Sequence, residues 1–98
     1  MALTADMESF IARTFKGSDR EAALSLCRSA TIEDGSPAGP RLIRCALIAS
    51  EASLEKLRVE IEHLKIDWRD VILAGEYVSR DGEFIRIRNL NEPIIEET

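Results

Sequence analysis

The chain has 98 residues, of which 45% are hydrophobic and 32% are charged, and its formal net charge is −5. This composition is typical of a globular protein, and the length predicts a single domain over residues 1–98. An acidic chain is a poor match for proteins that hold nucleic-acid phosphates through clustered Lys and Arg side chains.

The sequence also predicts a cytoplasmic location. No apolar run approaches the roughly 18 residues that span a bilayer, and residues 1–6 lack the basic segment and apolar run of a signal peptide. Cys27 and Cys45 both lie in apolar helical settings. We expect them to be small core residues in a reducing compartment and not a disulfide.

Two helices are predicted near the N-terminus. Residues 4–16 carry apolar side chains at helical spacing, with Thr4 as the candidate N-cap. Gly17 supplies the left-handed stop that helices commonly use. A second helix begins at Ser18, because Ser18 and Glu21 match the pattern of a capping box.

Residues 31–39 are the one clear linker, with two glycines and a proline over nine positions. We expect a flexible connecting loop, and a functional loop is the alternative. Pro40 suits the first position of a third helix. Residues 40–49 have little polar surface after Arg44, so this helix is expected to be central and buried on most sides.

Two further helices are predicted before residue 78. The fourth begins at Ser50 or Ser53 and is amphipathic up to Lys65. The fifth covers residues 67–77, with Asp67 as an N-cap that accepts a backbone N–H from the next turn. The chain therefore carries five predicted helices.

The fifth helix holds Trp68, the only tryptophan, and we expect its ring to fill the centre of the core. The alternative is a platform for a ligand or a partner protein. Gly75 lies on the same apolar face, where a missing side chain lets another helix approach closely. Glu76 is expected to lie outside that face.

The pattern changes after this helix. Asp81 and Gly82 form a favoured hairpin turn, and residues 84–88 alternate apolar and basic side chains as a short strand does. Tyr77–Ser79 either pair with this strand or form the last helical turn. Without that pairing, the strand needs the same strand of a second copy. The tail, residues 91–98, is expected to be ordered only if Ile94 and Ile95 dock.

Several segments together resemble a family of small, uncharacterised bacterial proteins. The resemblance covers less than half of the chain and implies a bacterial origin. It carries over no activity and no catalytic or binding residue. The matching segments are Leu42-Ile43-Arg44-Cys45-Ala46-Leu47, Leu54-Glu55-Lys56-Leu57, Asp67-Trp68-Arg69-Asp70-Val71-Ile72 and Glu76-Tyr77.

The sequence offers little material for catalysis or for a metal site, and we predict neither an enzyme nor a cofactor. His63 is the only histidine, and it stands four residues before Asp67 and seven before Asp70. These groups would converge only on one continuous helix, which a cap at Asp67 interrupts. There is no nucleophile elbow and no Gly-rich phosphate loop.

Two basic pairs stand out, Arg41 with Arg44 and Arg86 with Arg88. The second pair shares one face of the predicted strand and could hold an anion or an acidic partner. The favoured interpretation is a solvated face whose charge discourages edge-to-edge aggregation.

We therefore expect a mostly α-helical bundle of about five helices with a short C-terminal strand or hairpin. The expected function is protein–protein interaction, as a self-associating domain or as an accessory or regulatory subunit. The alternative is a small helical regulator that binds nucleic acid. No membrane or small-molecule partner is expected. The predicted contact residues are Phe84, Ile85, Arg86, Ile87 and Arg88, because this strand has no evident partner in its own chain.

Overall fold

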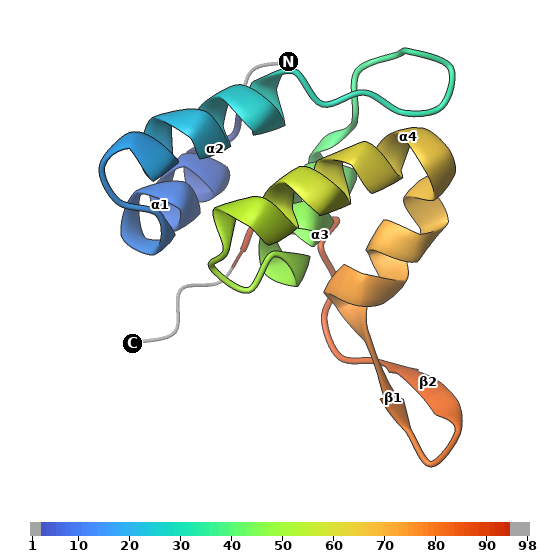
Figure 1. Cartoon of the computed structure of the whole chain (residues 1–98). Coiled ribbons are helices and arrows are strands. Elements are labelled where there is room, and N and C mark those ends of the chain that lie inside the picture. The colour runs from blue at the N-terminus through green and yellow to red at the C-terminus, as the bar shows by residue number, and fades with distance from the viewer. Residues whose placement is uncertain (1–2, 95–98) are drawn as a thin grey trace.

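The computed structural model describes residues 3–94, which form four helices and an antiparallel hairpin (Figure 1). The helices build a body in which α4 packs against both α3 and α2, and α1 packs against α2; the hairpin projects away from that body (Figure 1). The elements in chain order are α1 (Ala5–Thr14), α2 (Ser18–Arg28), α3 (Pro40–Ala49), α4 (Leu54–Glu76), β1 (Tyr77–Arg80) and β2 (Glu83–Arg86).

The predicted count of five helices is wrong, because the fourth and fifth are one bent helix. The backbone leaves the helical region at Asp67 alone, with φ −154° and ψ 98°. The carboxylate of Asp67 accepts a hydrogen bond from the Arg69 amide at 3.1 Å, as expected for an N-cap. The cap therefore exists, but it bends α4 (Figure 1) instead of following a loop.

The core confirms α3 as the central helix. Pro40 is at its first turn, and five consecutive residues of α3, Ile43–Leu47, are buried. Aliphatic side chains from α1 and α4 close over them. The largest fully buried apolar side chains are Met7, Ile11, Ile43, Leu47, Leu57, Leu64 and Val71.

At Gly75 α4 packs closely on α3, as expected from the sequence. A Cβ atom added to Gly75 would lie 2.6 Å from the Cα of Cys45 on α3. Real Cβ atoms do not come so close, so only glycine allows α4 to pack on α3 at this point. Cys45 and Cys27 are both buried free thiols, which confirms their expected place in the core.

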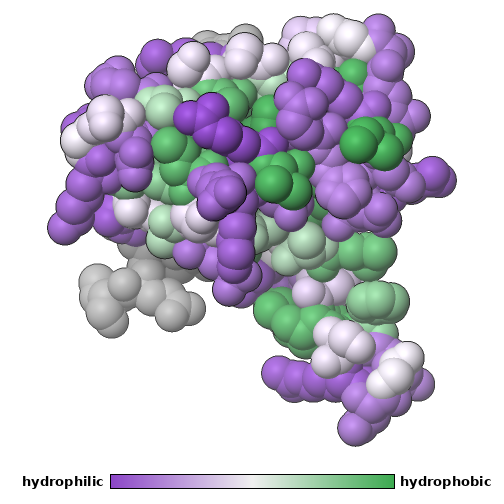
Figure 2. Space-filling model, viewed as in Figure 1, coloured by the Kyte–Doolittle hydropathy of each residue, from purple (hydrophilic) through white to green (hydrophobic). Residues whose placement is uncertain are grey.

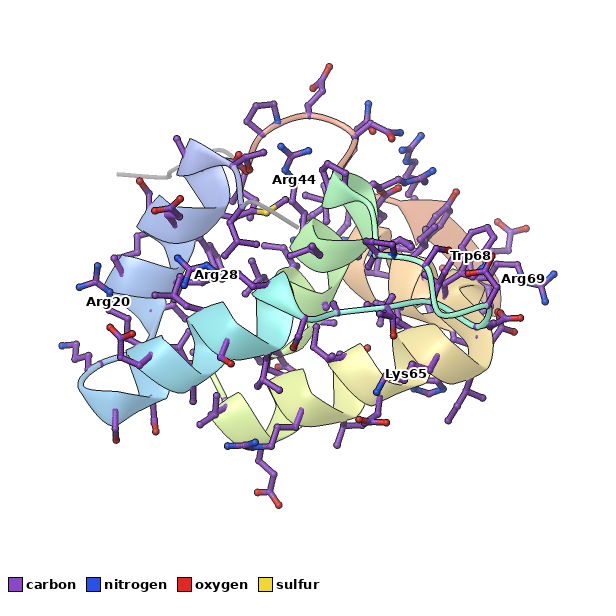
Figure 3. The ribbon with its side chains drawn as sticks, turned by 90° about the horizontal axis from the view of Figure 1, so that it is seen from above. Arg20, Arg28, Arg44, Lys65, Trp68 and Arg69 are labelled. Carbon is purple, nitrogen blue, oxygen red and sulfur yellow. The ribbon has the colours of Figure 1, made fainter. Side chains whose placement is uncertain are left out.

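Trp68 does not fill the centre of the core, so that prediction is wrong. Its ring is half-buried at the bend of α4, beside the loop of residues 31–39 (Figure 3). Aliphatic residues already fill the space between α1, α3 and α4. Trp68 follows directly on the kink at Asp67, and it covers one edge of this core.

The helix starts agree only partly with expectation. Thr4 is the N-cap residue of α1, but its side chain donates to Asp6 and caps no backbone amide. The capping box at Ser18 does not form, because Gly17, with φ +60°, takes the N-cap position of α2. Ser53 caps α4 by accepting the Lys56 amide at 3.2 Å.

The loop of residues 31–39 has hydrogen bonds of its own. A single bridge joins Thr31 to Pro37, and the Ala38 amide donates to the Ala30 carbonyl at 2.9 Å. Ala38 is fully buried, so the loop ends inside the core. The flexibility expected for this loop stays a prediction.

The C-terminal strand is one arm of a hairpin, which confirms one of the two expected arrangements, and the expected lack of a partner in its own chain is wrong. β1 pairs with β2 in the antiparallel register that places Tyr77 opposite Arg86. Asp81 and Gly82 have φ values of +51° and +80°, the left-handed pair that a two-residue hairpin turn requires. Tyr77–Ser79 therefore form a strand and not a helical turn.

After β2 the chain returns to the body. Leu90 is buried, and Ile94 packs against the core while its amide donates to Asp6 at 3.0 Å. The expected docking of the tail thus holds for Ile94, and Ile95 lies outside the described residues. Among the helices described, none combines the length and the apolar character that crossing a membrane would take.

Candidate functional site

A buried carboxylate stands where the hairpin leaves the body. Glu76, the last residue of α4, is fully buried. Arg41 donates to both of its oxygens, from Nε at 2.9 Å and from Nη2 at 2.9 Å. Arg86 of β2 approaches to 2.8 Å, and the Leu90 amide donates at 3.1 Å. One side chain therefore joins α3, α4, β2 and the segment after β2 that contains Leu90.

These contacts keep Glu76 ionised. The hydrogen bonds from Arg41 are the largest influence, and they outweigh burial to lower the pKa of Glu76 to about 2. The sequence pattern placed this residue outside the apolar face, and that prediction is wrong. Burial is possible because every lone pair finds a donor from another element, which a helical pattern alone cannot reveal.

The backbone around Glu76 closes the base of the hairpin. The Ile87 amide donates to the Glu76 carbonyl at 2.8 Å, and Arg88 donates from Nη1 to the Gly75 carbonyl at 2.8 Å. The last carbonyls of α4 are thus satisfied by the far arm of the hairpin. We conclude that the hairpin is fixed to the end of α4.

A second ion pair holds the returning chain. Arg44 is 6% exposed and donates to Asp6 from Nε at 2.9 Å, and it also donates to the Leu90 carbonyl at 3.3 Å. Burial opposes ionisation of Asp6, but hydrogen bonds from Arg44, Thr4 and the Ile94 amide outweigh it and hold its pKa well below the usual range. This pair ties α1 to α3.

The structure gives each arginine of the two basic pairs an acceptor within the chain, while Arg86 and Arg88 stay exposed. Arg41 and Arg86 bind Glu76, Arg44 binds Asp6, and Arg88 caps the end of α4. Their guanidinium groups bind intramolecular acceptors, and both interpretations of the Arg86 and Arg88 pair stay predictions. Their main role in the described chain is to attach segments to one another.

The buried groups are poorly suited to catalysis. Burial raises the pKa of the Cys45 and Cys27 thiols to about 12, so both stay protonated and unreactive near neutral pH. No three potential ligands converge on a metal position within residues 3–94. His63 lies 3.7 Å from Asp70, while Asp67 pairs with Arg69 instead.

The register determines which side chains share a face of the hairpin. Val78 lies opposite Ile85, and Arg80 lies opposite Glu83. Because side chains alternate along a strand, both pairs share one face, and Ile87 continues it toward the body. We call this surface the apolar hairpin face: Val78, Ile85 and Ile87, with Arg80 and Glu83 at the tip.

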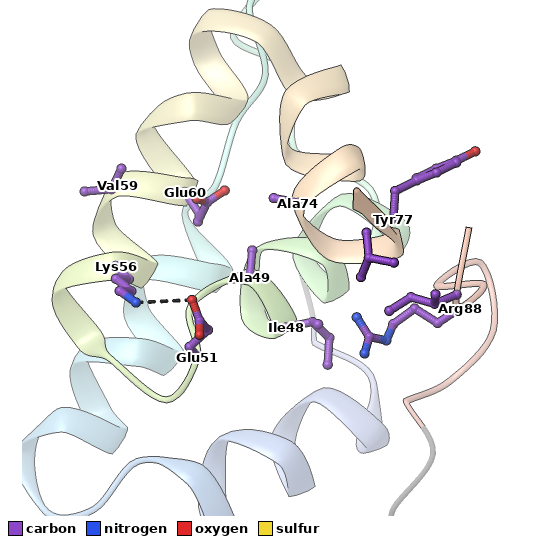
Figure 4. A pocket seen from close by; sticks show the side chains of 11 residues that line it. Ile48, Ala49, Glu51, Lys56, Val59, Glu60, Ala74, Tyr77 and Arg88 are labelled. Carbon is purple, nitrogen blue, oxygen red and sulfur yellow. Dashed lines mark hydrogen bonds and ion pairs between the residues drawn. The ribbon is translucent and has the colours of Figure 1, made fainter. Parts of the chain in front are cut away.

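A cleft of about 660 Å³ opens between this face and the body (Figure 4). Its floor and walls come from α3, from both halves of α4 and from the base of the hairpin. The ring of Tyr77 points out of the cleft (Figure 4). We call it the hairpin cleft; its lining residues are Ile48, Ala49, Glu51, Lys56, Val59, Glu60, Ala74, Tyr77, Val78, Ile87 and Arg88.

The five predicted contact residues lie together but face in different directions. Phe84, Ile85 and Ile87 are 65%, 40% and 42% exposed, and hydrophobic surface gathers where the hairpin leaves the body (Figure 2). Phe84 lies on the face opposite Ile85. Arg86 and Arg88 turn to the base, where they bind Glu76 and the Gly75 carbonyl. All five residues are exposed, and the two arginines differ from the apolar members in that their guanidinium groups bind within the chain.

Comparison with known proteins gives no further lead. No protein-family model matches the chain, and neither a curated protein nor a solved structure is significantly similar to it. Any functional argument therefore depends on the residues themselves.

Sequence reasoning missed the residues that shape this site. Glu76 and Arg41 are 35 positions apart, and no local pattern links them. The cleft depends on Ile48 and Val59, which meet the hairpin only through the packing of α3 and α4. The one local signal was Gly75, whose close-packing role places the end of α4 against α3.

Proposed function

We propose that this chain is a protein–protein interaction domain, an accessory or regulatory unit whose contact element is the hairpin with Phe84–Arg88. The observation that supports this most is an apolar hairpin that is firmly attached to the body but not covered by it. Phe84, Ile85 and Ile87 are the largest exposed apolar side chains of this element.

The energetics favour a partner for this surface. Complete burial of an Ile or Phe side chain contributes about 1.5–3 kcal/mol. A free two-stranded hairpin is marginally stable at best, and here Arg86 and Arg88 hold it to the end of α4. An element that is already ordered loses little conformational entropy when it binds, so more of the burial energy becomes affinity.

The alternative of a nucleic-acid regulator has less support. Arg41, Arg44, Arg86 and Arg88 all have acceptors inside the chain, which reduces the basic surface available to phosphates. The net charge of −5 adds a general repulsion. Bacterial origin, cytoplasmic location and the absence of enzymatic activity stay predictions.

Photo-crosslinking in cells of the source organism tests the proposal. A benzophenone amino acid replaces Ile85 in one variant and Ile66 in a matched control. Ile66 is 73% exposed but lies near the bend of α4, outside the lining of the hairpin cleft. We expect a discrete protein adduct from position 85 and none from position 66. Equal adducts at both positions, or none at position 85, would contradict the proposal.

A further inference from the structure

We infer that the partner of the apolar hairpin face is a second copy of this chain, which packs the same face against it across a twofold axis and places its tip in the hairpin cleft. This inference rests on the proposed function and names the partner. It follows from the way the chain distributes apolar side chains and charges between the hairpin and the cleft.

The geometry of the hairpin suits a twofold contact. In such a contact one patch must be complementary to itself. Two hairpins that pack face to face and antiparallel bring each tip over the base of the other. Each strand has four residues, so the tip lies about 13 Å from the base. Val78, Ile85 and Ile87 then meet their counterparts between tip and base, and both sets are removed from water.

The charges agree with this arrangement. The tip carries Arg80 and Glu83, and the side chains of both lack an ion pair within residues 3–94. The cleft carries Lys56, which pairs with Glu51 at 3.2 Å, and Glu60, which has no ion pair in the same part of the chain. In the proposed packing the second copy's Arg80 and Glu83 enter the cleft together, where Glu60 and Lys56 supply the opposite charges.

Glu60 is suited to receive a cation. It points from the first half of α4 toward Ala74 and the cleft (Figure 4). Burial raises the pKa of its carboxyl, and the charge of His63 only partly offsets that effect. A guanidinium group would replace the hydration that Glu60 has lost, through a charge-assisted hydrogen bond.

A second copy explains both halves of the surface at once. The second copy covers the apolar hairpin face with its own apolar hairpin face and fills the hairpin cleft with its tip. The twofold axis uses every contact twice. Because the hairpin is short, the interface falls near the small end of specific contacts, below roughly 1,200 Å² in total. We therefore expect a dimer that dissociates on dilution.

Light scattering after size exclusion, over a concentration series of the purified full chain, tests the inference. The mass should rise from 11.0 kDa toward twice that value. Ile85→Thr should weaken association roughly tenfold. The matched change Ile66→Thr should leave it within about twofold, because position 66 is outside the contact. Circular dichroism checks that both variants fold.

A charge exchange tests the pairing of tip and cleft. Arg80→Glu and Glu60→Arg should each weaken association by roughly threefold or more, and the double variant should recover most of the loss. Recovery requires that the two positions meet across the interface. If each change acted independently through folding, the losses of the two single variants would add in the double variant.

Three results would overturn the inference. The chain could stay at 11.0 kDa at every concentration. A dimer could form that Ile85→Thr does not weaken, or the charge exchange could fail to recover association. The crosslinking experiment separates these failures from failure of the proposed function, since an adduct from position 85 with a different protein leaves the interaction domain standing and excludes the second copy.

Discussion

The helical body and the hairpin are held in place by different kinds of interaction. In the body, apolar side chains of α1, α3 and α4 are buried against one another and form the core. In the hairpin, Ile85 and Ile87 stay exposed, and the attachment is made by charges and backbone groups around Glu76. The apolar side chains of the body are therefore buried on folding, whereas those of the hairpin stay exposed to solvent.

This difference separates stability from binding. Changes at the base of the hairpin should affect folding, because Glu76 is buried and fully hydrogen-bonded. Changes on its apolar face should affect association and leave folding nearly unchanged. The predictions that follow test this separation, from the largest expected effect to the smallest.

Removal of the buried carboxylate should have the largest effect. Glu76→Ala leaves Arg41, Arg86 and the Leu90 amide without their shared acceptor. We expect the free energy of unfolding to fall by about 3–5 kcal/mol in urea denaturation. Glu62→Ala is the control, because Glu62 is exposed and pairs only with Lys65, and it should change stability by less than about 0.5 kcal/mol.

The same carboxylate should make stability fall in acid. Its pKa in the folded chain is about 2, below the 4.5 of an unperturbed Glu, so its contribution is complete above pH 4.5 and is lost as the pH falls toward 2. The loss should be on the order of 3 kcal/mol, with Asp6 acting in the same direction. Glu76→Gln should flatten the curve of stability against pH in this window; an unchanged slope would contradict the account.

The close contact of α4 with α3 should not tolerate a methyl group. Gly75→Ala places a Cβ 2.6 Å from the Cα of Cys45, and we expect a loss of about 1–3 kcal/mol in thermal or urea unfolding. The same change in an open helix would be stabilising by up to about 1 kcal/mol. Gly39→Ala is the control, since nothing lies within 4 Å of its added Cβ. Equal effects at both positions would show that the contact is loose.

The apolar face should contribute least to folding. Ile85→Thr keeps a β-branched residue in β2, and we expect the unfolding free energy of the dilute chain to change by less than about 0.5 kcal/mol. Ile43→Thr, at a fully buried position of α3, provides the contrast and should cost several times more. A large loss from Ile85→Thr would mean that the hairpin face belongs to the core.

Local sequence signals predicted much of the fold. Apolar spacing located the helices, Pro40 and Ser53 marked two helix starts, and Asp81 with Gly82 marked the hairpin turn. These features depend on neighbours in the chain, so a local pattern can identify them. The break at Asp67 was also visible, although it bends a helix and does not end one.

The candidate site was less predictable because it depends on packing. Glu76 has the sequence pattern of a surface residue, and only the arrival of Arg41 and Arg86 allows it to be buried. Trp68 shows the opposite error, since a large ring suggests a central place that smaller aliphatic residues occupy. The position of Phe84–Arg88 in an exposed element was expected, but for the wrong reason, because β1 already pairs with that strand.

The most direct test is a methyl NMR experiment on isoleucine-labelled protein with a soluble paramagnetic agent. In dilute solution the agent should broaden the methyl signals of Ile85, Ile87 and the exposed control Ile66, and spare the buried Ile43. At high concentration Ile85 and Ile87 should become protected and shift, while Ile66 stays broadened. If Ile85 and Ile87 are protected in dilute solution, or stay broadened at every concentration, the hairpin face is not the surface on which two copies meet.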